Sequence, residues 1–362
     1  MRVAVVIERF GAHGGVESAA THLVRELAQR GVEVTVIARE ASGPPPDGAA
    51  LETLRVSGVW QPLRLRGFSR GAARATRGRF DVVHSFSRTR EQQIYRVGGG
   101  CHAAYMERVY RAPRLLRGLS PRHRAILAIE EAVFRDETQL IQCNARWVAE
   151  ELRERYGIAR ERLVTIYNGV DTARFHPGTR EARRTEILSE LGVPGPLALF
   201  VGTGFQRKGL DLAIRGLAES GVEADLAVVG AGDPAPYRRR AAELGVARRV
   251  HFLGPRSDVA TLYAAADLFV LPTRYDAFAN ACLEAMASGL AVATTSANGA
   301  SELIEPGVNG LLCASDFSPA FAALRDLAGL AKLGCAARAT AERFTWRAHA
   351  DRVLELYARI RP

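Results

Sequence analysis

The stretch that decides the fold reads Leu268-Phe-Val-Leu-Pro-Thr-Arg-Tyr-Asp-Ala-Phe-Ala-Asn-Ala-Cys-Leu-Glu284. Its first four residues are apolar and are followed by a proline, which is typical of a buried parallel strand. The residues after the proline predict a helix at the carboxyl end of that strand, where open α/β sheets bind their ligands. The sequence therefore predicts an α/β fold with a ligand site at this turn.

Two acidic residues of this stretch, Asp276 and Glu284, lie eight positions apart. Two helical turns take about 7 residues, so both carboxylates would share one face, with Asp276 in the loop and Glu284 inside the helix. Between them, free backbone N–H groups of Phe278, Ala279 and Asn280 would meet a phosphate at the helix N-terminus. One segment could thus hold an anion and two hydroxyl-bearing rings, as in a sugar nucleotide. The other interpretation is an ordinary helix with an acidic first turn and an incidental glutamate.

Composition indicates an ordinary globular protein of about two domains, because the chain has 362 residues, of which 48% are hydrophobic and 24% charged. The five cysteines are scattered and form no C-x-x-C pair. This argues against a disulfide framework or a zinc site and suits a reducing cytosol. No apolar run approaches the about 18 residues of a membrane span, and residues 1–7 are too short for a signal peptide and predict a first strand.

The net charge is +10, and nearly all of the positive charge comes from arginine. Such a balance indicates an anionic substrate or an anionic surface as partner. The other explanation of the high arginine and alanine content is a GC-rich genome. The sequence has no recognisable DNA- or RNA-binding module, so nucleic acid is not predicted as a partner.

Short apolar runs alternate with helical patterns in two series along the chain. The first series opens with a strand at 3–7, a glycine turn, a helix at 17–30 and a strand at 32–38, which is a βαβ unit. The second series opens with a strand at 197–201. We predict two doubly wound domains at 1–175 and 176–343, joined by a hinge at about 170–196, and a C-terminal helix within 344–362.

These motifs resemble the family 4 retaining glycosyltransferases, which have the two-domain GT-B fold. The pair Asp276-x7-Glu284 is similar to the family's acidic pair, although its first acid is usually Glu. The other matching motifs are Gly14-Gly15, Asn168-Gly-Val-Asp171, Arg207-Lys208-Gly209 and Glu302-Leu-Ile…Gly307-x-Asn-Gly310. The resemblance implies two Rossmann-like domains facing across a cleft, with the acceptor on the first, the nucleotide sugar on the second, and the C-terminal helix crossing back to the first.

Arg207 and Lys208 follow a Gly202-x-Gly204 turn at the end of the strand predicted at 197–201. A guanidinium and an ammonium can both neutralise a diphosphate leaving group if they project from a loop or a first helical turn. An exposed basic pair is the alternative. No Asp-x-Asp metal cradle occurs in a suitable place, so we expect neither a metal nor another cofactor, with the basic pair replacing a divalent cation.

The family resemblance also implies roles for single residues. Glu284 would accept hydrogen bonds from the ribose, Asp276 would lie near the transferred sugar, and the glycine turns would approach the donor phosphates. His102, beside the Gly98-Gly-Gly100 loop, would contact the donor sugar, with a solvated loop histidine as the alternative. The predicted catalytic residues are Arg207, Lys208, Asp276 and His102. The predicted donor-binding residues are Gly14, Gly15, Gly204, Arg256, Phe278, Ala279, Asn280 and Glu284. For Arg256, contact with the base or phosphate and a solvated loop position both remain open.

Residues 94–102 and the basic stretch after them resemble the branch that contains lipopolysaccharide core glucosyltransferases. This resemblance implies transfer of a hexose, with UDP-glucose as the expected donor, to a glycan or lipid-linked acceptor such as lipopolysaccharide core. Residues 105–126 carry six arginines and one acid among apolar side chains. That mixture predicts docking on an anionic membrane surface, and hence a cytoplasmic protein peripheral to the inner face of the cytoplasmic membrane. A solvated basic loop is the alternative.

Particular residues disfavour other functions. A dehydrogenase requires G-x-G-x-x-G and an acid after the second strand, whereas the chain has Gly11-x-x-Gly14-Gly15 and Arg39. A glycoside hydrolase requires two carboxylates across the scissile bond, and Asp276 is the only loop acid recognised. Two alternatives remain open: a sugar-nucleotide 2-epimerase, which shares the fold, and a non-catalytic, membrane-docked protein that binds sugar nucleotides.

Overall fold

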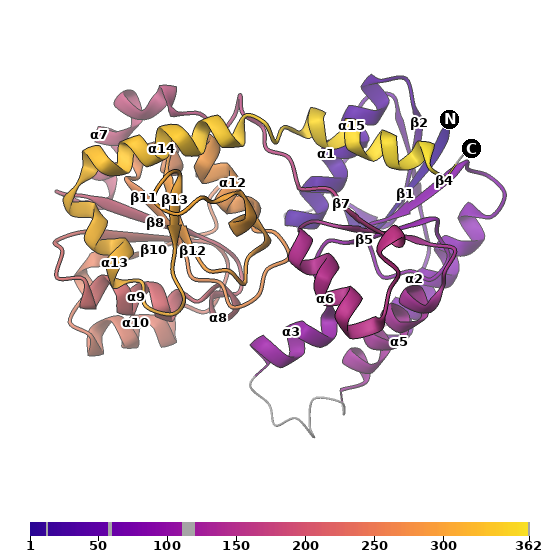
Figure 1. The fold of residues 1–362 in the computed structure, drawn as a ribbon, viewed down its shortest axis with the longest axis horizontal. Helices are drawn as coiled ribbons and strands as arrows, with labels where there is room; N and C mark the ends of the chain where they lie inside the picture. Colours follow the sequence, from indigo (N-terminus) through magenta and orange to yellow (C-terminus); the bar gives the residue numbers. More distant parts are fainter. Residues whose placement is uncertain (12–13, 57–59, 111–119, 361–362) are drawn as a thin grey trace. The chain divides into compact units, whose positions relative to one another are not determined.

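The computed structural model describes residues 1–11, 14–56, 60–110 and 120–360 and divides the chain into two compact units (Figure 1). Unit 1 comprises Met1–Gly169 and Trp346–Pro362, and unit 2 comprises Val170–Thr345. The predicted boundary at 175/176 thus lies inside unit 2. The reason is backbone pairing: Val170 forms a bridge with Thr345, and its N–H donates to the Phe344 carbonyl at 2.9 Å.

Within the described residues, unit 1 contains a seven-stranded sheet in the order β3-β2-β1-β4-β5-β6-β7, and every neighbouring pair is parallel. The strands are β1 (Arg2–Phe10), β2 (Glu33–Ala41), β3 (Ala49–Thr53), β4 (Val82–Ser85), β5 (Ile94–Val97), β6 (Leu140–Cys143) and β7 (Leu163–Thr165). The helices are α1 (Gly15–Gln29), α2 (Gln61–Thr76), α3 (His102–Val109), α5 (Pro121–Arg135), α6 (Arg146–Tyr156) and α15 (Trp346–Ala358).

The core of unit 1 joins segments from both ends of the chain. Helix α1 buries the apolar face that its periodicity predicts, namely Ala20, Leu23, Val24 and Leu27. Helix α15 adds Val353 and Leu356 to the same cluster and lies beside α1 (Figure 1). The predicted C-terminal helix is therefore a structural part of unit 1.

Unit 2 contains a six-stranded parallel sheet in the order β10-β9-β8-β11-β12-β13, counted over its described residues. The strands are β8 (Leu197–Val201), β9 (Asp225–Val229), β10 (Val250–Gly254), β11 (Leu268–Leu271), β12 (Ala291–Thr294) and β13 (Gly310–Leu312). The helices are α7 (Arg180–Leu191), α8 (Phe205–Lys208), α9 (Leu210–Glu219), α10 (Ala235–Glu243), α11 (Val259–Ala265), α12 (Asn280–Ala287), α13 (Ser318–Ala322) and α14 (Leu327–Ala341).

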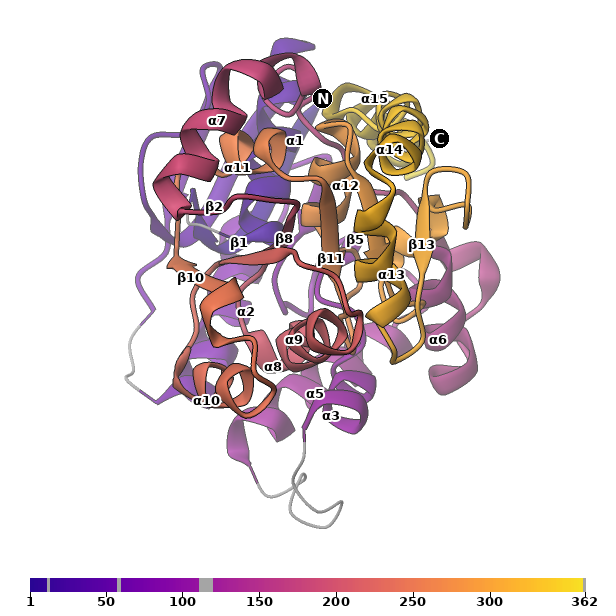
Figure 2. The same ribbon diagram turned by 90° about the vertical axis from the view of Figure 1, so that its left-hand side faces the viewer.

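Helices cover both faces of the sheet of unit 2. Helices α9 and α10 lie on one side of β8 and β11, and α7, α11, α12 and α14 lie on the other (Figure 2). This double cover explains why β11 is a continuous apolar run with all four residues buried. The predicted α/β class with two doubly wound halves is confirmed.

The strand orders show where each unit is suited to bind a ligand. The order reverses between β8 and β11 in unit 2 and between β1 and β4 in unit 1. Loops that leave the carboxyl ends of strands on either side of such a reversal diverge and leave a crevice between them. Among the described residues, no helix is long and apolar enough to cross a bilayer.

Candidate active site

The candidate active site of unit 2 is built from the loops that follow β8 and β11. The loop after β8 leads into α8, a single helical turn that is flanked by Gly204 and Gly209. Both glycines adopt left-handed conformations, with φ of 78° and 75°, which few other residues tolerate. A Cβ on Gly209 would lie 2.0 Å from the carbonyl oxygen of Pro272. Glycine is therefore required where α8 meets the end of β11.

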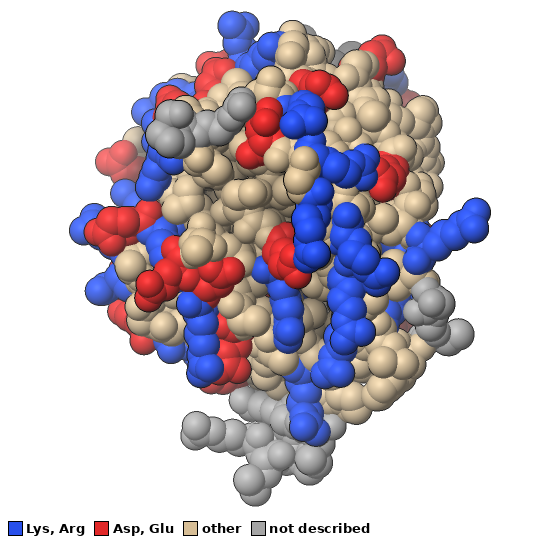
Figure 3. All heavy atoms as spheres, turned by 90° about the vertical axis from the view of Figure 1, so that its right-hand side faces the viewer, with Lys and Arg blue, Asp and Glu red and all other residues tan. Residues whose placement is uncertain are grey.

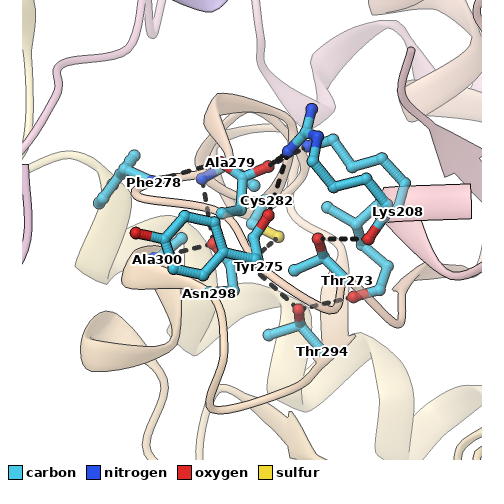
Figure 4. Close-up of polar contacts among 12 residues, drawn as sticks. Lys208, Thr273, Tyr275, Phe278, Ala279, Cys282, Thr294, Asn298 and Ala300 are labelled. Carbon is cyan, nitrogen blue, oxygen red and sulfur yellow. Dashed lines mark hydrogen bonds and ion pairs between the residues drawn. The ribbon is translucent and has the colours of Figure 1, made fainter. Parts of the chain in front are cut away.

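Helix α8 presents two cations to one carboxylate of the β11 loop. The carbonyl of Arg207 accepts hydrogen bonds from the Arg274 N–H at 2.8 Å and the Thr273 hydroxyl at 3.2 Å, which fixes the helix on the loop. Arg207 Nη1 then lies 2.7 Å and Lys208 Nζ 2.5 Å from Oδ2 of Asp276. Figure 4 shows Lys208 and Thr273 at this site. The two basic residues thus project from a single helical turn, as expected, and the anion between them is the carboxylate of Asp276.

The triad of Arg207, Lys208 and Asp276 has one excess positive charge, from two cations and one anion. Burial would raise the pKa of the Asp276 carboxyl, but the charges of Lys208 and Arg207 and their hydrogen bonds lower it to about 2. Asp276 is therefore ionised at neutral pH. A positive excess at the reversal of the strand order is suited to an anionic ligand.

Asn298 holds the loop that carries Asp276. It is fully buried and forms a backbone bridge with Asp276. Its Oδ1 accepts hydrogen bonds from the N–H groups of Ala279 at 3.0 Å and Ala300 at 3.1 Å, and its Nδ2 donates to Thr294 Oγ1 at 3.1 Å (Figure 4). Sequence reasoning missed this residue, although an Asn-Gly pair just after β12 was a signal for a polar turn.

The structure corrects the predicted phosphate cradle at the start of α12. The helix begins at Asn280, and two of the N–H groups that precede it already have protein partners. The N–H of Phe278 donates to Asp276 Oδ1 at 3.3 Å, and that of Ala279 donates to Asn298. The prediction of free donors is therefore wrong for Phe278 and Ala279, because short polar side chains compete for N–H groups at helix starts.

As predicted, Glu284 lies on α12 and Asp276 lies in the loop before it. Glu284 Oε2 accepts a hydrogen bond from the hydroxyl of Tyr263 at 3.1 Å. Burial raises the pKa of Glu284, whereas this hydrogen bond and the charges of Arg174 and Lys208 act in the opposite direction. Tyr263, which the sequence analysis did not single out, thus positions the second acid.

Arg256 is engaged outside this cluster. Its guanidinium donates to Asp258 through Nε at 2.8 Å and Nη2 at 2.7 Å, and to Glu190 through Nη1 at 2.8 Å. Two carboxylates thus balance its charge within unit 2, and Arg256 has no described contact with the triad.

His102 belongs to unit 1, where it begins α3 and is buried. Its Nε2 lies 2.9 Å from His123 Nδ1, and its backbone N–H donates to Glu130 Oε2 at 3.0 Å. Burial lowers the pKa of His102 to about 3, with contributions from Arg88 and His123. The ring is neutral at physiological pH, and the alternative of a solvated loop histidine is wrong.

Gly14 precedes α1 in unit 1 and Gly15 is its first residue, and a carboxylate of the protein lies at this turn. A Cβ on Gly14 would lie 2.3 Å from Glu17 Oε2, so the Glu17 side chain folds back over this glycine. Arg9 Nη2 donates to Glu17 Oε1 at 3.3 Å. Among the described residues, no group of three or more His, Cys, Asp or Glu side chains could hold a metal ion.

The basic stretch 105–126 is described only in part. Arg108 pairs with Glu151 at 2.9 Å, and Arg122 and Arg124 are exposed on the first turn of α5. The other three arginines, Arg111, Arg114 and Arg117, lie outside the described residues. Elsewhere on the surface, Lys and Arg side chains form rows across one face (Figure 3).

Comparison with known proteins identifies the family. The model for Glycosyltransferase Family 4 matches residues 13–174, and that for glycosyl transferases group 1 matches residues 195–327. The D-inositol 3-phosphate glycosyltransferases of Nocardia farcinica and Mycolicibacterium paratuberculosis are each 30% identical to this chain, over 96% of it and 85% and 86% of their own lengths. The chain therefore belongs to glycosyltransferase family 4 and is a glycosyltransferase.

Solved structures agree on the fold. WaaG, a glycosyltransferase involved in lipopolysaccharide biosynthesis, matches with a TM-score of 0.85 and 24% identity over 98% of this chain and 99% of its own. HepE of Anabaena, in complex with UDP and glucose, matches with a TM-score of 0.78 and 19% identity over 99% and 100%. The predicted GT-B fold is confirmed.

Proposed function

We propose that the protein is a retaining hexosyltransferase that takes glucose from UDP-glucose and transfers it to a glycan or lipid-linked acceptor, such as lipopolysaccharide core. The observation that carries the proposal is the triad of Arg207, Lys208 and Asp276 at the reversal of the strand order in unit 2. UDP and glucose in the complex of HepE support the donor. The role of WaaG in lipopolysaccharide biosynthesis supports the acceptor class.

The triad accounts for departure of the nucleotide. As the anomeric bond loosens, negative charge grows on the diphosphate, and the cations of Arg207 and Lys208 stabilise it. Asp276 already orients both cations on its Oδ2, so little reorganisation is needed when the charge develops. The acceptor then attacks the face that the leaving group vacates, and no covalent enzyme nucleophile is assigned. In this scheme the basic pair takes the place of a divalent metal.

Glu284 supplies the second half of the donor site. Its carboxylate accepts hydrogen bonds from the ribose hydroxyls, and Tyr263 holds the side chain in position through the 3.1 Å hydrogen bond. The hydrogen bond also favours the ionised carboxyl against the effect of burial. Nucleotide affinity should therefore depend on both residues.

We also propose that residues 105–126 dock the protein on an anionic membrane surface at the cytoplasmic face. Arg122 and Arg124 are exposed, and Tyr110 is 40% exposed. Each cation near an anionic bilayer contributes about 1 kcal/mol, so binding of vesicles that contain phosphatidylglycerol should fall as salt rises. Equal binding to neutral vesicles would contradict this part of the proposal.

The transferase proposal is tested by following UDP-[13C]glucose by NMR in the presence of candidate acceptors. A retaining enzyme gives an α-linked product, and slow release to water gives α-glucose first. Turnover should fall by about 10² in the double variant Arg207→Ala/Lys208→Ala, because preorganised cations are lost. The matched control is Arg215→Ala/Arg240→Ala, which removes a half-buried and an exposed cation of unit 2 that pair with Glu219 and Glu243. An inverted product, or a loss of less than about fivefold, contradicts the proposal.

A further inference from the structure

Unit 1 has a pocket of its own, with a volume of about 200 Å³, at the carboxyl ends of β1, β4 and β5. It therefore lies where the strand order of unit 1 reverses, which is the position expected for a ligand. The residues of interest in its lining are Glu8, Val16, Glu17, Arg88, Arg96 and Gly98.

Arg96 is a buried cation in the lining of this pocket. Its side chain on β5 is only 2% exposed, and its guanidinium lies 4.9 Å from the centre of the Phe86 ring. Nη2 donates to Asn168 Oδ1 at 2.7 Å, whereas Nε and Nη1 have no hydrogen-bond partner. Burial lowers the pKa of Arg96 only to about 10, so the group remains charged at neutral pH. Buried donors of a charged group are costly when they are left unpaired.

The acids around the pocket do not balance this charge. Glu8 pairs with Arg39 at 3.1 Å, and Glu17 pairs with Arg9 at 3.3 Å. Within the described part of the chain, no carboxylate forms an ion pair with Arg96. An uncompensated buried cation is rare, because its desolvation is repaid only by a counter-charge.

The neighbouring buried side chains are also not counter-charges. His84 and His349 each have an Nε2 without a partner. Burial lowers the pKa of both rings, to about 4 for His349, and the nearby Arg96 adds to this effect. Both rings are thus neutral at physiological pH, and Arg96 is the charged group among these three buried side chains.

A glycine of the pocket lining lies directly beside the unpaired nitrogen Nη1, which is itself buried. A Cβ on Gly98 would lie 2.4 Å from Arg96 Nη1 and 3.0 Å from Val16 Cγ2. Any larger residue would therefore fill the space between the guanidinium and the first turn of α1. The chain Gly98-Gly-Gly100 along this side of the pocket leaves the same space free of side chains.

We propose that this pocket binds an anionic group of the acceptor, such as a phosphate ester, with Arg96 as its charged contact. The guanidinium would donate from Nη1, which lies beside Gly98, to the anion, and the anion would supply the missing counter-charge. Calling the ligand an acceptor rests on the proposed transferase function. The anion site itself does not, because it is argued from the contacts of unit 1 alone.

The test is a thermal-unfolding titration of the full chain with inorganic phosphate, and with a hexose 6-phosphate against the neutral hexose. Both phosphates should stabilise the protein saturably, and the neutral hexose should not. In Arg96→Gln the apparent phosphate affinity should fall by at least about tenfold, with partial recovery in Arg96→Lys. The matched control is Arg162→Gln, because Arg162 donates to backbone carbonyls of Phe134 and Gln139. It should change stability but not the phosphate response.

Gly98→Ala keeps the arginine and closes the space above it, so it should lose the phosphate response as well. This second variant separates binding from a general structural role of Arg96. A phosphate response of Arg96→Gln or Gly98→Ala equal to that of the unaltered protein overturns the proposal.

Two further titrations separate the acceptor from the donor. The phosphate response should persist in Arg207→Ala/Lys208→Ala, and its loss there would place the anion in unit 2 and overturn the proposal. UDP should stabilise Arg96→Gln as it does the unaltered protein. Loss of the UDP response together with the phosphate response would assign the pocket to the donor diphosphate and overturn the acceptor role. If UDP fails to bind the unaltered protein while phosphate binds through Arg96, the proposed donor is wrong and the anion site stands.

Discussion

Replacing Asp276 with Asn should destabilise unit 2 at neutral pH by an amount that the ion pairs determine. The pKa of this carboxyl falls from its ordinary 3.8 to about 2 because Lys208 and Arg207 outweigh the effect of burial. The difference of about 1.8, at about 1.36 kcal/mol for each pH unit, corresponds to about 2 kcal/mol. Asn resembles the protonated acid in size and in lacking charge, so a similar loss is expected for Asp276→Asn.

The sign of the pH dependence follows from the direction of the shift. Because the folded pKa lies below the unfolded pKa, the stabilisation is fully present above the unfolded value of 3.8 and is lost as pH falls toward about 2. The stability difference between the unaltered protein and Asp276→Asn should therefore be about 2 kcal/mol at pH 7 and should narrow below about pH 4.

Hydrogen exchange read by mass spectrometry is the suitable assay, since all three tryptophans, at 60, 147 and 346, lie in unit 1 and do not report on unit 2. Opening free energies are compared for peptides of residues 197–312, with Asp233→Asn as control. Asp233 is an exposed acid of unit 2 that accepts a hydrogen bond from the Ala235 N–H at 3.0 Å, as Asn also can. Its replacement should change stability by less than about 0.5 kcal/mol. Equal stability of Asp276→Asn and the unaltered protein at pH 7, or a difference that persists on acidification, would refute the reasoning.

Three other substitutions test the construction of the site. Gly209→Ala should lower the free energy of unfolding, measured in urea, by more than about 2 kcal/mol. The new Cβ would lie 2.0 Å from a backbone carbonyl oxygen, and alanine would have to adopt a strained φ of 75°. The control is Gly245→Ala, where φ is 73° but the new Cβ would have no atom within 4 Å, so the loss should be only about 1 kcal/mol. Equal losses for the two variants would contradict the close approach of Gly209 to the Pro272 carbonyl. Tyr263→Phe removes a hydrogen bond that lowers the pKa of Glu284, so the loss of UDP affinity on acidification, measured by calorimetry, should begin at a higher pH. An unchanged pH profile would rule out that role. Asn298→Ala should lower the free energy of unfolding in urea by about 2–4 kcal/mol, because it leaves the buried N–H groups of Ala279 and Ala300 unpaired. A loss below about 1 kcal/mol would show that other contacts hold the loop that carries Asp276.

Strands with uninterrupted apolar runs were predictable, because both faces of a parallel sheet are covered. Leu268–Leu271 and Leu197–Val201 were predicted with the bounds that the structure has. The edge strands Ala49–Thr53 and Gly310–Leu312 were not predicted. The residues of Ala49–Thr53 are half-buried or exposed, and Gly310–Leu312 is too short to show a period. Hydrophobicity therefore gives no clear signal for either strand.

The residue types of the site were predictable, and their partners were not. Arg207 and Lys208 were recognised as a pair for an anion, but a separation of 68 residues from Asp276 hides the ion pairs from the sequence. The N–H group of Ala279 was expected to be free because its partner, Asn298, lies on a different loop. The N–H group of Phe278 is bonded by Asp276, two residues earlier in the same loop. Arg96 was passed over because the sequence does not distinguish a buried strand arginine from an exposed one.

A thermal-shift screen of UDP, GDP, ADP and their sugar conjugates, on the unaltered protein and on Glu284→Ala, tests the donor site of unit 2 directly. UDP and UDP-glucose should stabilise the protein, and Glu284→Ala should lose this response because the ribose contact is gone. No stabilisation by any nucleotide, or a UDP response that Glu284→Ala retains in full, would contradict the assignment of the donor site to unit 2.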